Sequence, residues 1–195
     1  VYDSGKDAML PYLRLGKEDV ILDGLAVFDD DKMVGRVNAE EARLLAYLMG
    51  RMSVGELDAE LPEPTSHAEH ARVLLMYLKL KHKIDVSQVG NRPKFQIHLE
   101  VKGAVSEYTG AADLENPDSI KKLEKQLEAK LQKDATAVLH KLQKEFHSDP
   151  MGFGEMYRAH GYVEELTKTK WRKYYQQADI GVDVKIRIMQ TGMIH

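Results

Sequence analysis

The sequence predicts an α+β fold, in which an antiparallel or mixed β-sheet is covered on one side by one long helix and several shorter helices. Residues 94–102 and 180–189 alternate between apolar and polar side chains, as half-buried strands do. Between them, from Asn116 to Phe146, apolar residues recur every three or four positions, which is the spacing of an amphipathic helix.

Composition indicates an ordinary globular protein with a sizeable core. The chain has 195 residues, of which 43% are hydrophobic and 30% charged. A net charge of -3 gives no broad electrostatic field for nucleic acid, so we expect no nucleic-acid partner. The sequence holds no cysteine, which excludes disulfides, thiolate zinc sites and a cysteine nucleophile.

A membrane anchor is expected to lie outside this chain. No run of residues reaches the roughly 18 apolar positions that span a bilayer. The chain begins at Val1 rather than at an initiator methionine and shows no signal peptide. We therefore expect a processed form or a part of a longer protein, with any anchor elsewhere.

The first elements are predicted to be a lead-in, a hairpin and a helix. Residues 1–17 contain scattered glycine and proline and predict an irregular lead-in, so that residues 18–195 form a single α+β domain. Apolar segments at 20–28 and 32–37 flank an acidic turn at 29–31, which is typical of a β-hairpin. Asn38 then fits a helix N-cap. The predicted helix ends near Gly50. Its apolar face consists of Leu44, Leu45, Tyr47 and Leu48.

The middle of the chain predicts further strands. A short strand is expected within 52–61, and a proline-containing loop follows at 61–66. Alternating residues in 78–86 and 95–101 flank a turn at Gly90 and Asn91. One face of this pair is charged, which indicates an antiparallel hairpin with one side in water.

The long helix is the clearest element. Asn116 fits the N-cap, and Pro117 is favoured at the first helical position. The apolar stripe predicts roughly eight or nine turns, ended by Asp149 and Pro150. Its members are Ile120, Leu123, Leu127, Leu131, Val138, Leu142 and Phe146. A tight connection at 151–154, a short helix from Glu155, a second helix across 164–177 and a closing strand are expected to follow.

Histidine pairs are the first candidates for a chemical site. His67 and His70 have the H-x-x-H spacing of two zinc ligands on a helix, but a third ligand is missing and a solvated loop is the preferred interpretation. His140 and His147 lie seven residues apart on the long helix, and the preferred interpretation is an exposed helical surface. We predict no metal site.

Three other segments invite a binding role. Gly152, Phe153 and Gly154 resemble a phosphate loop only loosely, and a sharp turn with Phe153 in the core is preferred. A basic cluster surrounds three aromatic residues: Lys168, Lys170, Arg172 and Lys173 lie around Trp171, Tyr174 and Tyr175. Such a cluster could bind RNA or anionic lipid, but the spacing of the aromatic residues favours a buried helix face. The acidic turn 29–31 lacks calcium-ligand spacing. No catalytic or cofactor-binding residue is predicted.

Three ordered blocks carry a family resemblance. The first comprises residues 22–28, 31–35 and 40–41; the second is 148–154; the third joins Trp171, 178–184 and 191–192. Together they resemble the Ger(x)C family, the C-terminal domain of the spore germinant receptor C subunit. The chain departs from that pattern at Pro150, at Tyr162 and Val163, where the family has a second tryptophan, and over 52–70.

The resemblance implies a non-enzymatic lipoprotein subunit that spore germination requires. It implies a position on the outer face of the inner spore membrane, beside A and B membrane subunits, with the lipidated cysteine outside this chain. It carries over no catalytic residue and no cofactor. We expect a scaffold or coupling domain, with the exposed face of the long helix as one contact. Two alternatives stay open: a domain that binds the germinant directly, and a metal-dependent hydrolase that uses the histidines.

Overall fold

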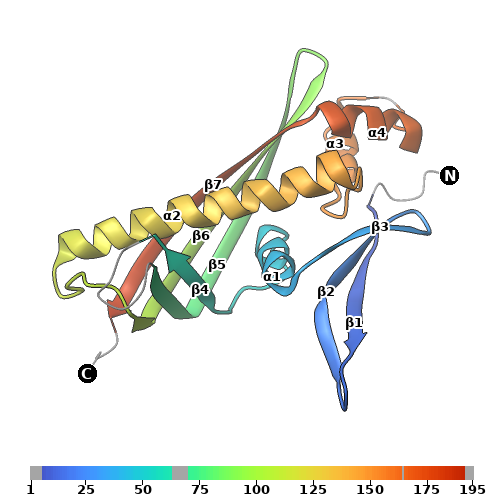
Figure 1. Ribbon diagram of the computed structural model, residues 1–195. Coiled ribbons are helices and arrows are strands. Elements are labelled where there is room, and N and C mark those ends of the chain that lie inside the picture. The colour runs from blue at the N-terminus through green and yellow to red at the C-terminus, as the bar shows by residue number, and fades with distance from the viewer. Residues whose placement is uncertain (1–5, 63–69, 164, 192–195) are drawn as a thin grey trace.

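In the part of the chain that the structure describes, one antiparallel sheet and one mixed sheet combine with four α-helices and a π-helical turn. The computed structural model describes residues 6–62, 70–163 and 165–191 (Figure 1). A three-stranded antiparallel sheet comes first, in the order β1 (Met9–Leu15), β2 (Val20–Asp29), β3 (Lys32–Val37). After helix α1 (Ala39–Leu48), a four-stranded sheet follows in the order β4 (Leu57–Leu61), β5 (Ala71–Val89), β6 (Arg92–Tyr108), β7 (Asp179–Thr191).

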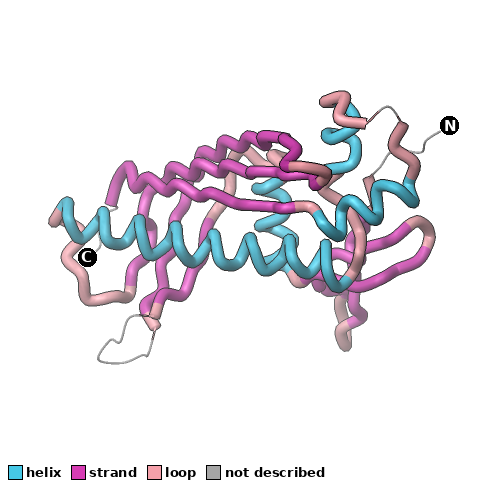
Figure 2. Tube along the Cα trace, turned by 90° about the horizontal axis from the view of Figure 1, so that it is seen from above, coloured by secondary structure: helices cyan, strands magenta, loops and turns pink. Residues whose placement is uncertain are grey.

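The larger sheet is mixed, because β7 runs parallel to β6 while β4, β5 and β6 are antiparallel. A parallel neighbour requires a long crossover. The crossover here consists of α2 (Pro117–His140), a π-helical turn η1 (Lys141–Glu145), α3 (Phe153–Ala159) and α4 (Lys168–Gln177). Helix α2 runs along the length of this sheet (Figures 1 and 2). The predicted α+β fold, with a long helix on a mixed sheet, is confirmed.

The predicted irregular lead-in is wrong for residues 9–15, which form β1 and pair antiparallel with β2. The physical reason is that β2 has an open edge that a neighbouring segment can satisfy. Pro11 is compatible with that role because β1 is itself an edge strand, whose outward N–H groups need no partner. The single domain over 18–195 stays a prediction.

Local capping sets the helix boundaries as expected. Asn38 and Glu41 form a reciprocal capping box at the start of α1, and Asn116 accepts the Asp118 N–H at the start of α2. Lys141 Nζ lies 3.0 Å from Glu41 Oε1, which ties the end of α2 to the start of α1. The second C-terminal helix begins later than predicted, at Lys168, because Thr167 supplies its N-cap.

Carboxylates of α2 close one edge of the larger sheet. Glu124 Oε1 accepts the Ile188 N–H at 2.9 Å, and Glu128 Oε1 accepts the Ile186 N–H at 3.1 Å. Both N–H groups belong to β7, an edge strand. Since open strand edges invite pairing with other chains, these contacts protect the β7 edge.

Candidate functional site

The most buried carboxylate of the described chain, Asp149, lies between η1 and α3 and is 2% exposed. Its Oδ1 accepts the N–H groups of Gly152 at 3.0 Å and Phe153 at 3.1 Å. Its Oδ2 accepts the Gly154 N–H at 2.9 Å and the Trp171 Nε1–H at 3.0 Å. We call Asp149, 152–154 and Trp171 the Asp149 junction. It holds the start of α3 against α4.

The sequence around Asp149 explains why this carboxylate is needed. The N-cap of α3 is Gly152, which has a left-handed φ of 78° and no side chain to cap the helix. The free N–H groups of the first turn therefore require another acceptor, and Asp149 provides it from three residues upstream. The predicted sharp glycine turn with Phe153 in the core is confirmed, since Phe153 is fully buried.

Trp171 lies close against the same turn. A Cβ added at Gly154 would lie 2.7 Å from Trp171 Nε1, so the close approach requires glycine. The indole also meets a cluster of aromatic rings, with centroid separations of 6.3 Å to Phe95, 6.0 Å to Tyr157 and 5.7 Å to Tyr175. Trp171 and Tyr175 of α4 are thus buried, as the preferred interpretation predicted, whereas Tyr174 is half-buried.

The junction also attaches the N-terminal sheet. Asp149 N–H donates to Asp7 Oδ2 at 2.7 Å, and Asp7 N–H donates to the Asp149 carbonyl at 3.1 Å. Next to it, Ser148 Oγ donates to the Phe28 carbonyl at 2.7 Å. These bonds join the segment before β1 and the end of β2 to the α2–α3 connection.

Ion pairs reinforce this attachment. Lys168 and Arg172 of α4 pair with the acidic β2–β3 turn, with Arg172 3.1 Å from Asp30. Two of the predicted basic residues therefore neutralise the acidic turn 29–31 instead of standing free for RNA or lipid. The pKa of Asp30 is lowered by its hydrogen bond from Lys168, which favours the carboxylate.

The protonation of Asp149 gives a first prediction. Burial raises the pKa of Asp149 from 3.8 to about 7, against the N–H donors of Gly154, Phe153 and Trp171, which favour ionisation. The folded state then holds a proton that the unfolded state releases near pH 4. The stability contributed by protonated Asp149 is complete below pH 3.8 and is lost as the pH rises through about 7.

We expect this loss to lower the free energy of unfolding by up to about 1.4 kcal/mol per pH unit within that window. Urea denaturation at a series of pH values, in the parent and in Asp149→Asn, measures it. The difference between the two proteins isolates Asp149 from the other carboxyl groups. Parallel pH profiles would contradict the assignment.

A histidine that sequence analysis did not single out lies in an exposed network across three strands. His98 of β6 contacts Asp85 of β5 at 3.1 Å and Asp183 of β7 at 3.5 Å. Asp85 also pairs with Lys83 at 2.7 Å, and the Lys83 hydrogen bond lowers the pKa of Asp85. Only the strand register brings these side chains together, so alternation alone could not have identified them.

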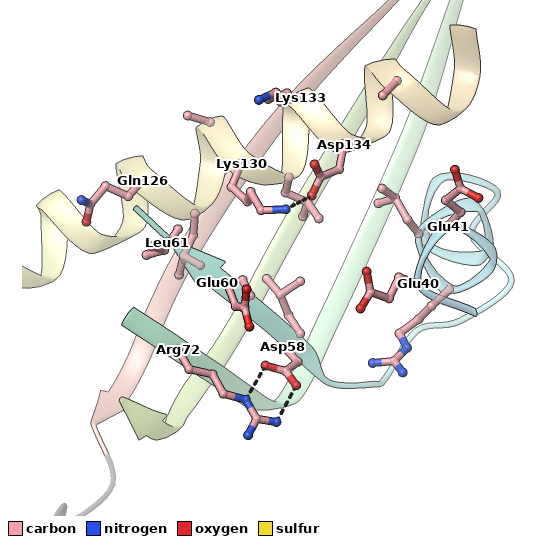
Figure 3. A pocket seen from close by; sticks show the side chains of 18 of the residues that line it. Glu40, Glu41, Asp58, Glu60, Leu61, Arg72, Gln126, Lys130, Lys133 and Asp134 are labelled. Carbon is pink, nitrogen blue, oxygen red and sulfur yellow. Dashed lines mark hydrogen bonds and ion pairs between the residues drawn. The ribbon is translucent and has the colours of Figure 1, made fainter. Parts of the chain in front are cut away.

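A broad groove lies between α1, β4 and α2 and has a volume of about 1020 Å³ (Figure 3). Charged side chains of both signs line it, and several pair with one another, such as Arg72 with Asp58 at 2.7 Å. The Arg72 hydrogen bond lowers the pKa of Asp58. This groove differs from the deep apolar pocket with a few converging polar groups that typifies small-molecule sites.

Of the two histidine pairs considered as metal ligands, only His140 and His147 lie wholly within the described residues. His140 and His147 are exposed, and the His147 ring contacts the Gln143 carbonyl of its own turn. His70 is exposed beside the groove, while His67 lies outside the described residues. Within the described ranges, no three histidine or acidic side chains are arranged to hold a metal ion. None of the described helices has the length and apolar character required to cross a bilayer.

Comparison with known proteins identifies relatives over nearly the whole chain. The family model "Spore germination B3/GerAC like, C-terminal" matches residues 23–192. Spore germination protein GerQC of Bacillus cereus is 26% identical over 191 residues, which cover 98% of this chain and 51% of that protein. Spore germination protein B3 of Bacillus subtilis is 26% identical over 173 residues, which cover 88% of this chain and 44% of that protein.

A solved structure shows the same fold. The crystal structure of the GerBC protein matches with a TM-score of 0.75 at 22% identity, over 95% of this chain and 57% of that chain. The chain spans about half the length of the curated relatives it matches, with 51% and 46% of two of them covered.

Proposed function

Because the chain belongs to the spore germination B3/GerAC-like, C-terminal family, we propose that it is part of the C subunit of a nutrient germinant receptor and serves spore germination as a non-enzymatic scaffold. Relatives over nearly the whole chain are named as spore germination proteins, which supports the process. The family model matches residues 23–192. The role in germination is proposed from the names of the relatives.

The Asp149 junction is the observation that favours a scaffold. Asp149 is the kind of buried, pKa-shifted carboxyl group that marks many active sites. Here both of its oxygens accept hydrogen bonds from within the fold, and its surroundings are a helix start and an indole. The group is thus used to fix the arrangement of α3, α4 and the N-terminal sheet, and it does not line the groove of Figure 3.

A coupling role follows from the same contacts. The N-terminal sheet is attached to the helices through Asp7, Ser148 and Arg172. A force on either part is then transmitted through part-buried hydrogen bonds and a partly exposed ion pair. We propose that the domain uses this rigidity to link the A and B membrane subunits of the receptor to nutrient binding.

The location is part of the same proposal. The full-length protein would be held by a lipid anchor outside this chain, on the outer face of the inner spore membrane. The relatives are about twice as long as this chain, which leaves room for an anchoring segment. The exposed face of α2 is a candidate contact surface.

Direct germinant binding is the alternative. The groove of Figure 3 would be its site, because it is large and carries charged groups that could meet a small polar nutrient. The groove is open to solvent, and several of its charged groups already pair with one another, so we favour the scaffold over germinant binding.

The second prediction concerns spores that carry the full-length subunit without residues 9–191. We expect these spores to lose the fall in optical density that nutrients trigger, because the membrane subunits no longer have the scaffold. Immunoblots of membrane fractions are expected to find the A and B subunits still inserted. A nutrient-independent trigger serves as the control and acts normally. A normal nutrient response in the deleted strain would contradict the proposed function.

A further inference from the structure

The β1–β2 hairpin exposes four large apolar side chains on one face. Their exposed fractions are 58% for Leu13, 82% for Leu15, 59% for Val20 and 62% for Leu22. We call these four residues the hairpin face. Single exposed leucines are ordinary, but a contiguous apolar group on a strand pair marks an interaction surface.

The strand register places the four side chains together. Leu13 is directly opposite Leu22, and Leu15 is directly opposite Val20. Directly opposite residues of an antiparallel pair project to the same side, as do residues two apart on one strand. The four side chains therefore form one continuous patch.

The other side of the hairpin is polar and internally paired. Arg14, which lies between Leu13 and Leu15, projects to that side, and its Nε is 3.4 Å from Asp23 Oδ2. Arg36 of β3 lies 3.9 Å from the same carboxylate and over the Tyr12 ring. Water thus meets an ion-paired face on one side of the hairpin and an apolar face on the other.

The hairpin face extends beyond the core of the described chain. Nearer the helices, β1 and β2 pair through Met9 and Val27, and Val27 is fully buried. Further along the strands, the hairpin points away from both α1 and the larger sheet (Figure 1). A two-stranded hairpin is at best marginally stable in water by itself, so its apolar side requires a cover.

We propose that this cover is the part of the full-length polypeptide that lies outside the family's C-terminal region. The relatives supply such a segment, because this chain covers only 51% and 46% of two of them. A segment on the same polypeptide has a high effective concentration, so that a small apolar patch suffices to hold it. The inference rests on the hairpin geometry and the family assignment, and does not depend on the scaffold function.

Two other occupants fit less well. A second copy of the chain would need a larger surface, since stable interfaces involve roughly 20–30 residues on each side and this face offers four. An anionic lipid surface attracts clusters of basic residues, whereas the hairpin turn carries Lys17 beside Glu18 and Asp19.

Photo-crosslinking tests the assignment in the full-length protein. A benzoylphenylalanine at position 15 replaces Leu15, and a matched control replaces Val89, which is 64% exposed at the end of β5. We expect position 15 to crosslink to residues of the same polypeptide outside 1–195, and position 89 not to do so. Crosslinks only to a second copy, to another protein or to lipid would overturn the proposal, as would no crosslink.

A variant adds an independent readout by hydrogen exchange in the full-length protein. We expect Leu13→Ser with Leu22→Ser to raise the exchange rate of the crosslinked segment at least about tenfold, because the packing that protects its amides is lost. Val89→Ser is expected to leave that rate unchanged. An unchanged rate in the double variant would show that the hairpin face is not the contact.

Discussion

Above about pH 8, where Asp149 is ionised, its replacement by asparagine is expected to lower the free energy of unfolding by about 3 kcal/mol. The asparagine amide keeps one oxygen that can accept hydrogen bonds, but its NH₂ group takes the place of the other oxygen. That NH₂ group would face the N–H groups that now donate to Oδ2, those of Gly154 and Trp171. A buried donor left without an acceptor costs about 1–3 kcal/mol, and two such donors are affected. Urea denaturation, followed by tryptophan fluorescence and far-UV circular dichroism, measures the change.

Asp58→Asn is the matched control. Asp58, like Asp149, accepts hydrogen bonds with both of its oxygens. Its donor is the Arg72 side chain, and the pair is exposed to solvent. Exposed pairs contribute about 0–1 kcal/mol, so we expect a loss within that range. If the two variants lost the same amount, Asp149 would be no more than an ordinary surface acid.

Trp171→Ala is expected to have the second large effect, a loss of about 4 kcal/mol. The indole is 3% exposed and packs against Phe95, Tyr157 and Tyr175, so its removal leaves a cavity in the core. Truncation of a buried aromatic side chain to alanine typically costs about 3–5 kcal/mol. The midpoint and slope of a urea transition give the free energy.

Trp171→Phe separates packing from hydrogen bonding. Phenylalanine retains most of the ring contacts but cannot donate to Asp149 Oδ2. We expect a loss of about half that of the alanine variant, because one hydrogen bond and part of the ring volume are removed. In a double-mutant cycle, Asp149→Asn and Trp171→Phe are expected to be non-additive by about 1 kcal/mol. Strict additivity would contradict a direct bond between the two side chains.

Local sequence signals predicted most elements because their causes are local. Asn38 and Asn116 cap their helices through residues two or three positions ahead, so the capping pattern is visible in the sequence. The apolar stripe from Ile120 to Leu142 lies on α2 and on the π-helical turn that continues it, so it can be recognised without knowledge of its partner. The acidic turn at 29–31 lies between two apolar segments that pair directly.

Elements that depend on distant partners were harder to predict. Strand β1 contains Pro11 and has little alternation, and it becomes a strand only because β2 offers an open edge. The alternation in β7 shows a half-buried strand but carries no information on direction, so its parallel pairing with β6 could not be derived. The π-helical turn at Lys141–Glu145 also has no local sequence signal that we identified.

The Asp149 junction shows the same division. Sequence analysis interpreted Asp149 as the end of the long helix and as part of the block 148–154 that carries the family resemblance. It did not identify the contact with Trp171, because that residue lies 22 positions away in the chain. The capping role of Asp149 could have been recognised from the sequence. Gly152 has no side chain to cap the helix that it begins, and an acidic residue lies three positions before it.

The most direct test of the claim that the domain contributes a folded shape and no proton-transferring group is the germination of spores whose full-length subunit carries His98→Gln. Glutamine can still hydrogen-bond to Asp85 but has no ring nitrogen that could transfer a proton. We expect the nutrient-triggered fall in optical density to match that of the parent strain. A lost response, with unchanged urea denaturation of the variant protein, would contradict the scaffold function.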